Sequence, residues 1–391
     1  MGRKLLPVNA PVTFLLLVFL LAPAAMLQGN NILFWLLAVL GAILVVALVG
    51  SSWMLRGLEL KRQLPLHGNV GEPLVIRYQV MRQRRWVPAF GLFIDEVFSG
   101  AGSRVFDISR SRAWILHVGP GETVHGEAVY TPLQRGRVEL TGFSVRTSFP
   151  FGMIRRSRRL SQLQHVLVYP RVYDLQHRVM EALVPRGPDG LRTARRRGGG
   201  DDYFGIRQIR TGDSVRDIAW KLSAHRNDLV AIDRARPSPP RVRIVLDLST
   251  PTEQLQVGSD ESFSPRELEE RAITLAASLV KAVTAAQLEV DLSVLGFSAP
   301  QLGFRGHAFH VHRLMTLLAG LDLDAPRRTG QAHVPTMEPA GLVVISPDRI
   351  RPVSHRPDAW YLTGRQLADL IVAPSPKAAA DVQQDKPEAA A

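Results

Sequence analysis

Two long apolar runs stand near the start of the chain. Pro11–Leu27 and Ile32–Gly50 contain only apolar or small residues, and the polar turn Gln28–Asn31 separates them. Each run is close to the roughly 20 residues that a helix needs to cross a hydrocarbon core. A signal peptide has a single shorter apolar region and a cleavage site, so the pair predicts a transmembrane hairpin within residues 1–57.

The charges beside these runs predict an orientation. Arg3 and Lys4 precede the first run, Arg56, Lys61 and Arg62 follow the second, and the turn between the runs carries no charge. Because positive residues are retained on the cytoplasmic side, both ends of the hairpin and the rest of the chain are expected in the cytoplasm.

From about Leu58 to Pro170 the apolar positions alternate over short segments, which is the pattern of half-buried strands, and residues 58–183 are assigned to one β domain. Gly, Pro and Ser separate the segments at spacings typical of an all-β sandwich of the immunoglobulin-like kind. The predicted strands are Leu74–Val80, Phe90–Phe98, Ala113–Val118, Val124–Tyr130, Val138–Arg146 and His165–Tyr169. Pro150 and Gly152 predict a turn that Phe149 and Phe151 can anchor. No catalytic constellation is visible in this region.

Residues 184–240 have another character. Their first part, residues 184–200, is rich in Pro, Gly and Arg and is interpreted as a linker or exposed loop. Its arginines can contact lipid headgroups together with a group upstream, and the alternative is a solvated loop. The arginines concerned are Arg155, Arg156, Arg158, Arg159, Arg195, Arg196 and Arg197.

A short helix is predicted after this loop, capped by Asp213 or Ser214. Apolar residues then recur at helical spacing on one face, namely Val215, Ile218, Ala219 and Leu222. Asp217 and Lys221 would form an i, i+4 pair on the exposed side of that helix. Leu229–Ile232 is predicted as a strand.

Strand and helix patterns alternate from residue 241 to residue 373. The predicted elements are the strands Val242–Leu246, Val290–Leu295, Leu342–Ile345 and Trp360–Leu362 and the helices Ser264–Gln287 and Phe309–Ala319. Such alternation is typical of a mainly parallel, Rossmann-like α/β sheet with helices on both faces. Residues 374–391 consist of Ala, Pro, Gln and charged residues and are predicted to be a disordered tail.

Composition excludes some chemistry and leaves other possibilities open. The chain has no cysteine, which excludes disulfides, a cysteine nucleophile and thiolate metal sites. The formal net charge of +13 suggests an anionic partner, either nucleic acid or an anionic membrane leaflet. The interpretation that we favour is that the arginines are scattered over solvated faces. No run resembles a nucleic-acid-binding motif, so no nucleic-acid partner is expected.

The segment Gly198–Trp220 resembles the DUF58 family. The residues that carry the likeness are Phe204–Arg207, Gly212–Asp213, Arg216, Ile218 and Trp220–Lys221, followed by Asp247–Ser249. Two upstream pieces, Arg135–Gly136 and Phe149–Gly152, are also typical of the membrane-anchored members of that family.

The resemblance implies a von Willebrand factor A-like α/β domain joined to a membrane-anchored β domain in the bacterial inner membrane. Members are associated with MoxR-type AAA+ ATPases and are thought to act as adaptors or in the assembly of other proteins; no enzymatic activity is established for them. The residues expected to bind a partner are Arg207, Asp213, Arg216, Trp220 and Lys221. The alternative is structural: Arg216 can pair with a carboxylate, and for Trp220 we favour a place in the core.

A von Willebrand A domain holds Mg²⁺ with an Asp-x-Ser-x-Ser sequence at the end of its first strand, because a hard cation prefers oxygen ligands. Asp247 and Ser249 match this sequence, but Pro251 replaces the second serine. Asp348 follows a later strand and is the candidate for a further ligand. These three residues predict a degenerate metal site, with Mg²⁺ as the possible ion. The alternative for Asp247 is to cap backbone amides at the end of its strand.

Other motifs are weaker. His307, His310 and His312 can in principle bind a transition metal, but their spacing matches no zinc pattern. Gly-x-Ser-x-Gly, His-Glu-x-x-His and Gly-Lys-Ser/Thr sequences do not occur, so hydrolase, metalloprotease and P-loop functions lack support.

The function that these features favour is a membrane-anchored, non-enzymatic interaction protein. Two alternatives stay open. One is a membrane-bound enzyme that acts on envelope precursors, with Asp213 or Asp247 as acid or base. The other is binding of nucleic acid or anionic lipid through the arginines.

Overall fold

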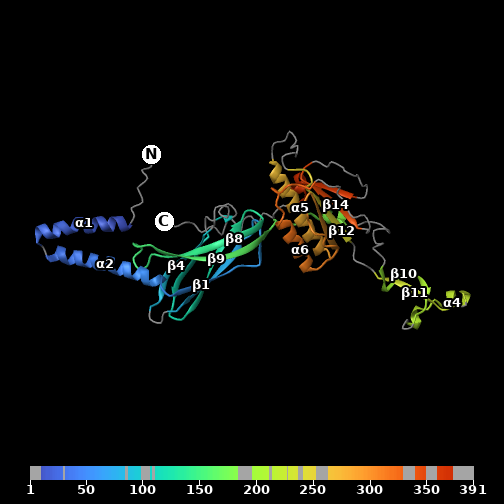
Figure 1. The fold of residues 1–391 in the computed structure, drawn as a ribbon, viewed down its shortest axis with the longest axis horizontal. Coiled ribbons are helices and arrows are strands. Elements are labelled where there is room, and N and C mark those ends of the chain that lie inside the picture. Colours follow the sequence, from blue (N-terminus) through green and yellow to red (C-terminus); the bar gives the residue numbers. More distant parts are fainter. Residues whose placement is uncertain are drawn as a thin grey trace. The chain divides into compact units, whose positions relative to one another are not determined.

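The computed structural model divides the chain into two compact units, residues 1–169 and residues 170–391. Figure 1 shows their helices and strands in the colours of the sequence. The structure describes residues 10–29, 31–83, 87–97, 106–107, 111–183, 196–210, 214–226, 228–236, 241–251, 263–328, 340–348 and 359–372. The predicted tail at residues 374–391 lies outside these ranges.

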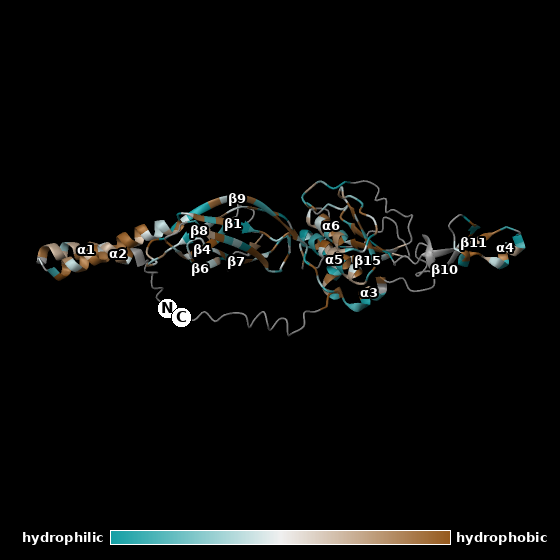
Figure 2. Ribbon diagram, turned by 90° about the horizontal axis from the view of Figure 1, so that it is seen from below, coloured by the Kyte–Doolittle hydropathy of each residue, from teal (hydrophilic) through white to brown (hydrophobic). Residues whose placement is uncertain are grey.

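The first unit begins with two antiparallel apolar helices, α1 (Ala10–Gln28) and α2 (Asn31–Leu55), which pack against each other. Figure 2 shows both helices brown along most of their length, as expected from their hydropathy. Helix α2 is long and apolar enough to cross a membrane, and α1 contains a shorter apolar stretch, Val12–Leu27. Few of the α2 side chains are buried within the protein, unlike those of a core helix.

Two sheets follow α2 in the first unit. One has the strand order β1-β3-β7-β5 and the other β2-β9-β8-β4-β6. The strands are β1 (Leu58–Gln63), β2 (His67–Asn69), β3 (Leu74–Arg82), β4 (Ala89–Val97), β5 (Phe106–Asp107), β6 (Ala113–Val118), β7 (Thr123–Pro132), β8 (Gly136–Thr147) and β9 (Arg156–Tyr169). All pairings are antiparallel except that of β2 with β9.

A single hydrophobic cluster joins the two sheets. In β3 every second residue from Leu74 to Val80 is buried, because alternate side chains of a strand point to opposite faces. The partners of these residues on the other sheet include Leu92, Ile94 and Phe143. The predicted two-sided strand pattern is thus confirmed.

The first unit ends earlier than predicted. The division between the units falls after Tyr169, where the predicted strand pattern also ends, whereas the predicted β domain extended to residue 183. The reason is that the following segment bonds within the second unit. The Tyr173 amide donates to Oγ of Ser278 at 3.0 Å, and the Gln176 amide donates to the Leu370 carbonyl at 2.9 Å.

The second unit contains a parallel sheet with the strand order β13-β12-β14-β15. Its strands are β12 (Arg241–Asp247), β13 (Glu289–Leu295), β14 (Gly341–Ser346) and β15 (Ala359–Thr363). Its helices are α3 (His177–Leu183), α5 (Pro265–Ala285), α6 (Ala308–Ala319), the 3₁₀ turn η4 (Gly364–Gln366) and α7 (Leu367–Leu370). The central strand β12 is buried at its first six positions, which comprise four apolar residues together with Arg241 and Arg243.

Helix α5 covers this sheet by packing on β12, β13 and β14, and α6 packs beside it. Ser264 caps α5 by accepting a hydrogen bond from the Glu267 amide at 3.2 Å, as the Ser-Pro start of the segment predicts. The alternating strand and helix pattern is therefore confirmed as a parallel α/β sheet.

Candidate functional site

The residues that resemble the DUF58 family fold into a small separate substructure, here called the signature arm (Arg196–Arg236). It consists of β10 (Arg196–Gln208), the 3₁₀ turn η2 (Val215–Asp217), α4 (Trp220–Arg226) and β11 (Val230–Arg236). The strands β10 and β11 pair with each other in antiparallel fashion as a two-stranded sheet. Figure 1 draws the arm with α4 beside β11.

The start of the signature arm corrects one prediction. Residues 196–200 were interpreted as part of a linker, but they form the beginning of β10. Arg197 and Asp202 both align with Ala235 of β11, so the residues between them bulge out of the pairing. Three of the four bulging residues are glycines, which tolerate the backbone conformations that a bulge requires. Residues 184–195 lie outside the described part.

The predicted helix in the arm is broken in two. Ile218 is extended, with φ −72° and ψ 126°, and separates η2 from α4. The break arises because Ile218 pairs with Ala231 of β11, and the Ala219 amide donates to the Val230 carbonyl at 2.8 Å. Asp217 and Lys221 therefore do not form an i, i+4 pair within one helix. The cap is Ser214, whose Oγ accepts from the Arg216 amide at 3.3 Å.

The core of the signature arm is small, and Trp220 is not part of it. Val230 and Ala231 are buried, Ile218 packs at 8% exposure, and Ser223 Oγ accepts from the Val230 amide at 3.0 Å. The expectation that Trp220 lies in the core is wrong, because 60% of its surface is exposed. One helix of seven residues on two strands cannot enclose an indole ring.

The exposed residues of the arm are both apolar and basic. Val215 is 67% exposed and Trp220 60%. Arg216 and Lys221 are also exposed, and Arg207 is half-buried. Large apolar side chains on the surface of so small a substructure are typical of a binding surface. Asp213, the fifth residue predicted to bind a partner, lies outside the described residues.

A cleft of about 280 Å³ lies on the same arm. It is lined by Ile206, Arg207, Gln208, Arg226, Asp228 and Val230. The Gln208 side-chain amide donates to Asp228 Oδ2 at 3.0 Å, which joins the end of β10 to the loop before β11. The cleft places Arg207 near Arg226 and Asp228, so that charged groups of both signs line it.

The second candidate site lies at the carboxyl end of the parallel sheet. Asp247 ends β12, and its Oδ1 accepts from the Ser249 amide at 3.0 Å and from Ser249 Oγ at 2.6 Å. Asp348 follows the adjacent strand β14 and is 5% exposed. Its Oδ1 accepts from Arg365 Nε at 2.6 Å. The alternative role of Asp247, capping of backbone amides at the end of its strand, is thus seen for the Ser249 amide.

These contacts do not fit an Mg²⁺ site. Arg365 already supplies a positive charge to Asp348, Asp247 Oδ1 is bonded to Ser249, and Pro251 has no hydroxyl. Among the described residues, no group of three or more His, Asp or Glu side chains could hold a metal ion. The sequence predicts a metal ion at this edge of the sheet, whereas the structure has the ion pair of Asp348 with Arg365 there.

The three histidines His307, His310 and His312 have different positions in the structure and do not form one site. His307 is the N-cap of α6, since its Nδ1 accepts from the His310 amide at 3.1 Å. The buried His310 ring lies 2.9 Å from the Val290 carbonyl through Nε2. His312 is exposed on the helix surface. Within the described residues the three rings share no metal-binding geometry.

Several arginines that sequence reasoning left as surface charge are structural. Arg241 pairs with Glu289 at 2.8 Å and Arg243 with Asp291 at 3.2 Å, along adjacent parallel strands. The Phe304 ring lies over both guanidinium groups, at 5.1 and 4.7 Å from its centroid. Only the strand register of β12 and β13 brings these pairs together, so no local signal could have identified them.

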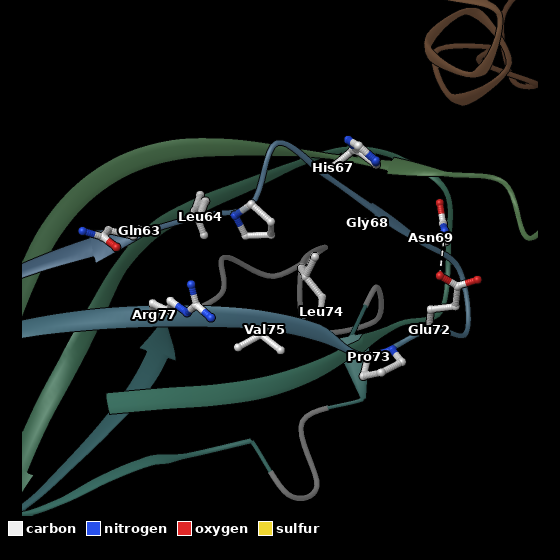
Figure 3. Close-up of a pocket in the computed structure, with 11 residues that line it drawn as sticks. Gln63, Leu64, His67, Gly68, Asn69, Glu72, Pro73, Leu74, Val75 and Arg77 are labelled. Carbon is white, nitrogen blue, oxygen red and sulfur yellow. Dashed lines mark hydrogen bonds between the residues drawn. The ribbon is translucent and has the colours of Figure 1, made fainter. Parts of the chain in front are cut away.

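A further cleft, of about 530 Å³, lies in the first unit and is shown in Figure 3. It is formed by the ends of β1 and β3 and by the β2 segment between them. In Figure 3 the Asn69 side chain points toward Glu72, to which it donates a hydrogen bond of 2.6 Å. Arg77 pairs with Glu127 at 2.8 Å. The charged side chains of this cleft therefore have partners on the protein and do not converge on a common point.

Neither a scan against models of known protein families nor a search of curated proteins found a match for this chain.

Proposed function

We propose that this protein is a membrane-anchored adaptor without enzymatic activity, related to the DUF58 family. In this proposal α1 and α2 cross the bacterial inner membrane as a hairpin. The β unit is an immunoglobulin-like sandwich, the parallel sheet is a von Willebrand A-like domain, and both face the cytoplasm. The membrane-compatible length of α2 and the basic residues on its flank support the anchor and its orientation.

The signature arm is the partner-binding surface of the proposed adaptor. The observation that carries this assignment is the exposure of Trp220, 60% of which is accessible at the first position of α4. Tryptophan and arginine dominate the energetics of protein interfaces. Here exposed Trp220 is followed by Lys221 and preceded by Arg216. A partner with an apolar pocket rimmed by acidic residues matches this chemistry, and we propose a MoxR-type AAA+ ATPase.

Crosslinking from position 220 tests the proposal. The full-length chain is expressed in its native membrane with Trp220→p-benzoylphenylalanine, irradiated, and the adducts are identified by mass spectrometry. Trp114 on β6 is the matched control site, since it is 57% exposed and lies in the first unit. We expect an AAA+ ATPase to be captured from position 220 and not from position 114. The same adducts from both positions would contradict the proposal.

A second experiment measures how much the indole ring of Trp220 contributes to binding of the partner. Trp220→Ala is expected to reduce recovery of the ATPase by about tenfold or more, since loss of an interface tryptophan costs about 2 kcal/mol or more. Trp114→Ala is expected to leave recovery unchanged. Equal melting temperatures for the two variants would show that the loss is not a folding defect.

A further inference from the structure

The turn Phe149–Gly152 lies directly against the membrane-compatible helix. A Cβ atom at Gly50 would lie 3.3 Å from the Cδ atom of Pro150, so the missing side chain lets the turn approach α2 closely. Gly50 ends the apolar run of that helix. Three residues later, at a rise of about 1.5 Å per residue, Trp53 is 44% exposed. Tryptophan is enriched at the interface between lipid and water, so the turn would lie at the depth of this interface if α2 crosses a membrane.

The turn is built rigidly and presents one phenyl ring outward. Its Gly152 amide donates to the Ser148 carbonyl at 2.7 Å, and Gly152 has φ +70°, in the region that favours glycine. The Phe149 ring stacks on Phe90 at a centroid distance of 4.9 Å. Phe149 is half-buried, whereas Phe151 is 51% exposed. An exposed aromatic ring held beside an apolar helix is suited to insertion among lipid chains.

Four arginines follow the turn within the next seven residues of the chain. Arg155, Arg156, Arg158 and Arg159 are all exposed. Residues 141–164 contain no Asp or Glu, so no acidic residue of this segment compensates the charge. The nearby Asp95 carboxylate on β4 already pairs with Arg146 and with Arg112.

The strand register directs part of this charge toward the helix. Arg156 and Arg158 align with Thr147 and Val145, whose side chains are buried, and therefore leave β9 on its inner face. Arg158 Nη1 donates to the Leu58 carbonyl at 3.3 Å, three residues after the end of α2. The basic group is thus anchored where α2 enters the β unit.

We infer that Phe151 and the arginines at positions 155, 156 and 159 form a second membrane contact, which binds anionic lipid headgroups of the bilayer that α2 crosses. This inference rests on the proposed membrane anchor. The phenyl ring enters the boundary between headgroups and acyl chains, and the guanidinium groups pair with lipid phosphates above it. The contact fixes the β unit against the membrane surface in addition to the single covalent connection through α2.

Site-directed spin labelling tests the contact, and the natural absence of cysteine makes single labelling sites available. The full-length chain is reconstituted in nanodiscs of phosphatidylcholine, with or without phosphatidylglycerol. Nitroxide labels are placed at Phe151→Cys, at Leu133→Cys and at Ala38→Cys in α2. Leu133 is 53% exposed and precedes the opposite end of β8, about 35 Å from the turn, and serves as the control.

The measured quantity is the accessibility of each label to oxygen relative to a water-soluble nickel chelate. In discs with anionic lipid, we expect the ratio at position 151 to exceed that at position 133 several-fold. The triple variant Arg155→Gln, Arg156→Gln, Arg159→Gln is expected to bring the ratio at position 151 down toward the value measured without anionic lipid. Arg158 is left unchanged because it bonds to the backbone.

Three outcomes would overturn the inference. If positions 151 and 133 are equally accessible to nickel while position 38 is protected, the protein is anchored but the second contact does not exist. If position 38 is also accessible to nickel, the membrane anchor itself fails and the inference fails with it. If duplex DNA binds the protein in neutral discs and the triple variant does not bind it, the arginines serve nucleic acid instead.

Discussion

The guanidinium of Arg82 donates from Nη1 to the backbone carbonyl of Met54 at 2.6 Å. It also donates from Nη2 to the Trp53 carbonyl at 3.1 Å and from Nε to the Val87 carbonyl at 2.9 Å. Arg82 has no exposed surface. The last carbonyls of a helix lack partners within the helix and carry its negative partial charge. A buried cation on β3 therefore caps α2 and joins the apolar helix to the β unit.

Arg82→Met should destabilise the first unit by about 3 kcal/mol, because it removes a charged donor and leaves buried carbonyls without partners. The unfolding transition of the full-length protein in detergent measures the loss. Arg77→Met on the same strand is the control, since Arg77 is 63% exposed and its pair with Glu127 lies in solvent. Its cost should stay within about 1 kcal/mol. Equal losses in the two variants would show that the cap contributes nothing.

The buried pair of Arg62 and Glu96 links the two sheets of the β unit. Both side chains are fully buried, and Arg62 Nη1 lies 2.6 Å from Glu96 Oε2. Tyr78 donates its hydroxyl to Glu96 Oε1 at 2.6 Å. Burial raises the pKa of the Glu96 carboxyl, whereas the bonds from Tyr78 and Arg62 act in the opposite direction. Burial also raises the pKa of the neighbouring Tyr130 hydroxyl to about 12.

Removing one partner of this pair should cost more than removing both. Arg62→Met leaves a buried carboxyl without its cation and is expected to cost about 3–5 kcal/mol. The double variant Arg62→Met, Glu96→Leu replaces the pair by apolar side chains and should be more stable than the single variant. A double-mutant cycle of denaturant unfolding checks this order. A double variant that is less stable than Arg62→Met would contradict it.

His310 should make the second unit sensitive to mild acid. Burial lowers the pKa of its imidazole, although the bond to the Val290 carbonyl acts in the opposite direction. Its Nδ1 is buried without a hydrogen-bond partner among the described residues, so a proton there would not be stabilised. A group whose pKa is lowered by folding contributes stability above its ordinary pKa of about 6.5. That stability is lost as the pH falls toward the lowered value.

We therefore expect the melting temperature to fall between about pH 7 and pH 5 in the wild type. The fall should be smaller in His310→Gln. His312→Gln is the control, because His312 is exposed on the same helix. Thermal melts at several pH values measure the difference. An identical acid sensitivity in wild type and His310→Gln would assign the effect to other groups.

Local sequence patterns were sufficient to predict a helix or strand where its formation depends on its own residues. The cap Ser264 and the periodic apolar face of α5 are signals of that kind, and both are present in the structure. The first nine residues of β9, 156–164, escaped prediction because they are polar and form a strand only through pairing with β8. The break at Ile218 has the same origin, since Ala231 pairs with it from outside the helix.

The candidate sites could likewise be predicted only in part from local sequence patterns. The sequence places Asp247 and Asp348 after neighbouring strands of the parallel sheet, as the structure has them. It does not reveal that Arg365, which lies 17 residues further along the chain, reaches Asp348. The exposure of Trp220 was also beyond prediction, because the sequence does not show that the signature arm is too small to enclose an indole ring. A contact between separate segments decides the first case, and the size of the folded substructure decides the second.

The pair of Asp348 and Arg365 yields a prediction about metal binding. Asp348 is 5% exposed and Arg365 27%, so the ion pair is only partly open to water. Gly364 holds the turn close: a Cβ there would lie 2.6 Å from the Leu268 carbonyl oxygen, so the position of Arg365 is constrained by packing. We expect that millimolar Mg²⁺ does not raise the melting temperature of the wild type, since Arg365 already neutralises the carboxylate.

Differential scanning calorimetry with and without Mg²⁺ checks this expectation. An ion that binds the folded state at a hundredfold excess over its Kd would stabilise it by about 2.7 kcal/mol, which is readily detected. Arg365→Met should destabilise the protein by about 2 kcal/mol, because it leaves a buried carboxylate unpaired. Arg266→Met is the control, since its pair with Asp324 is exposed. A Mg²⁺-dependent rise in the wild type that disappears in Asp348→Asn would show that this carboxylate binds metal and that Arg365 gives way to it.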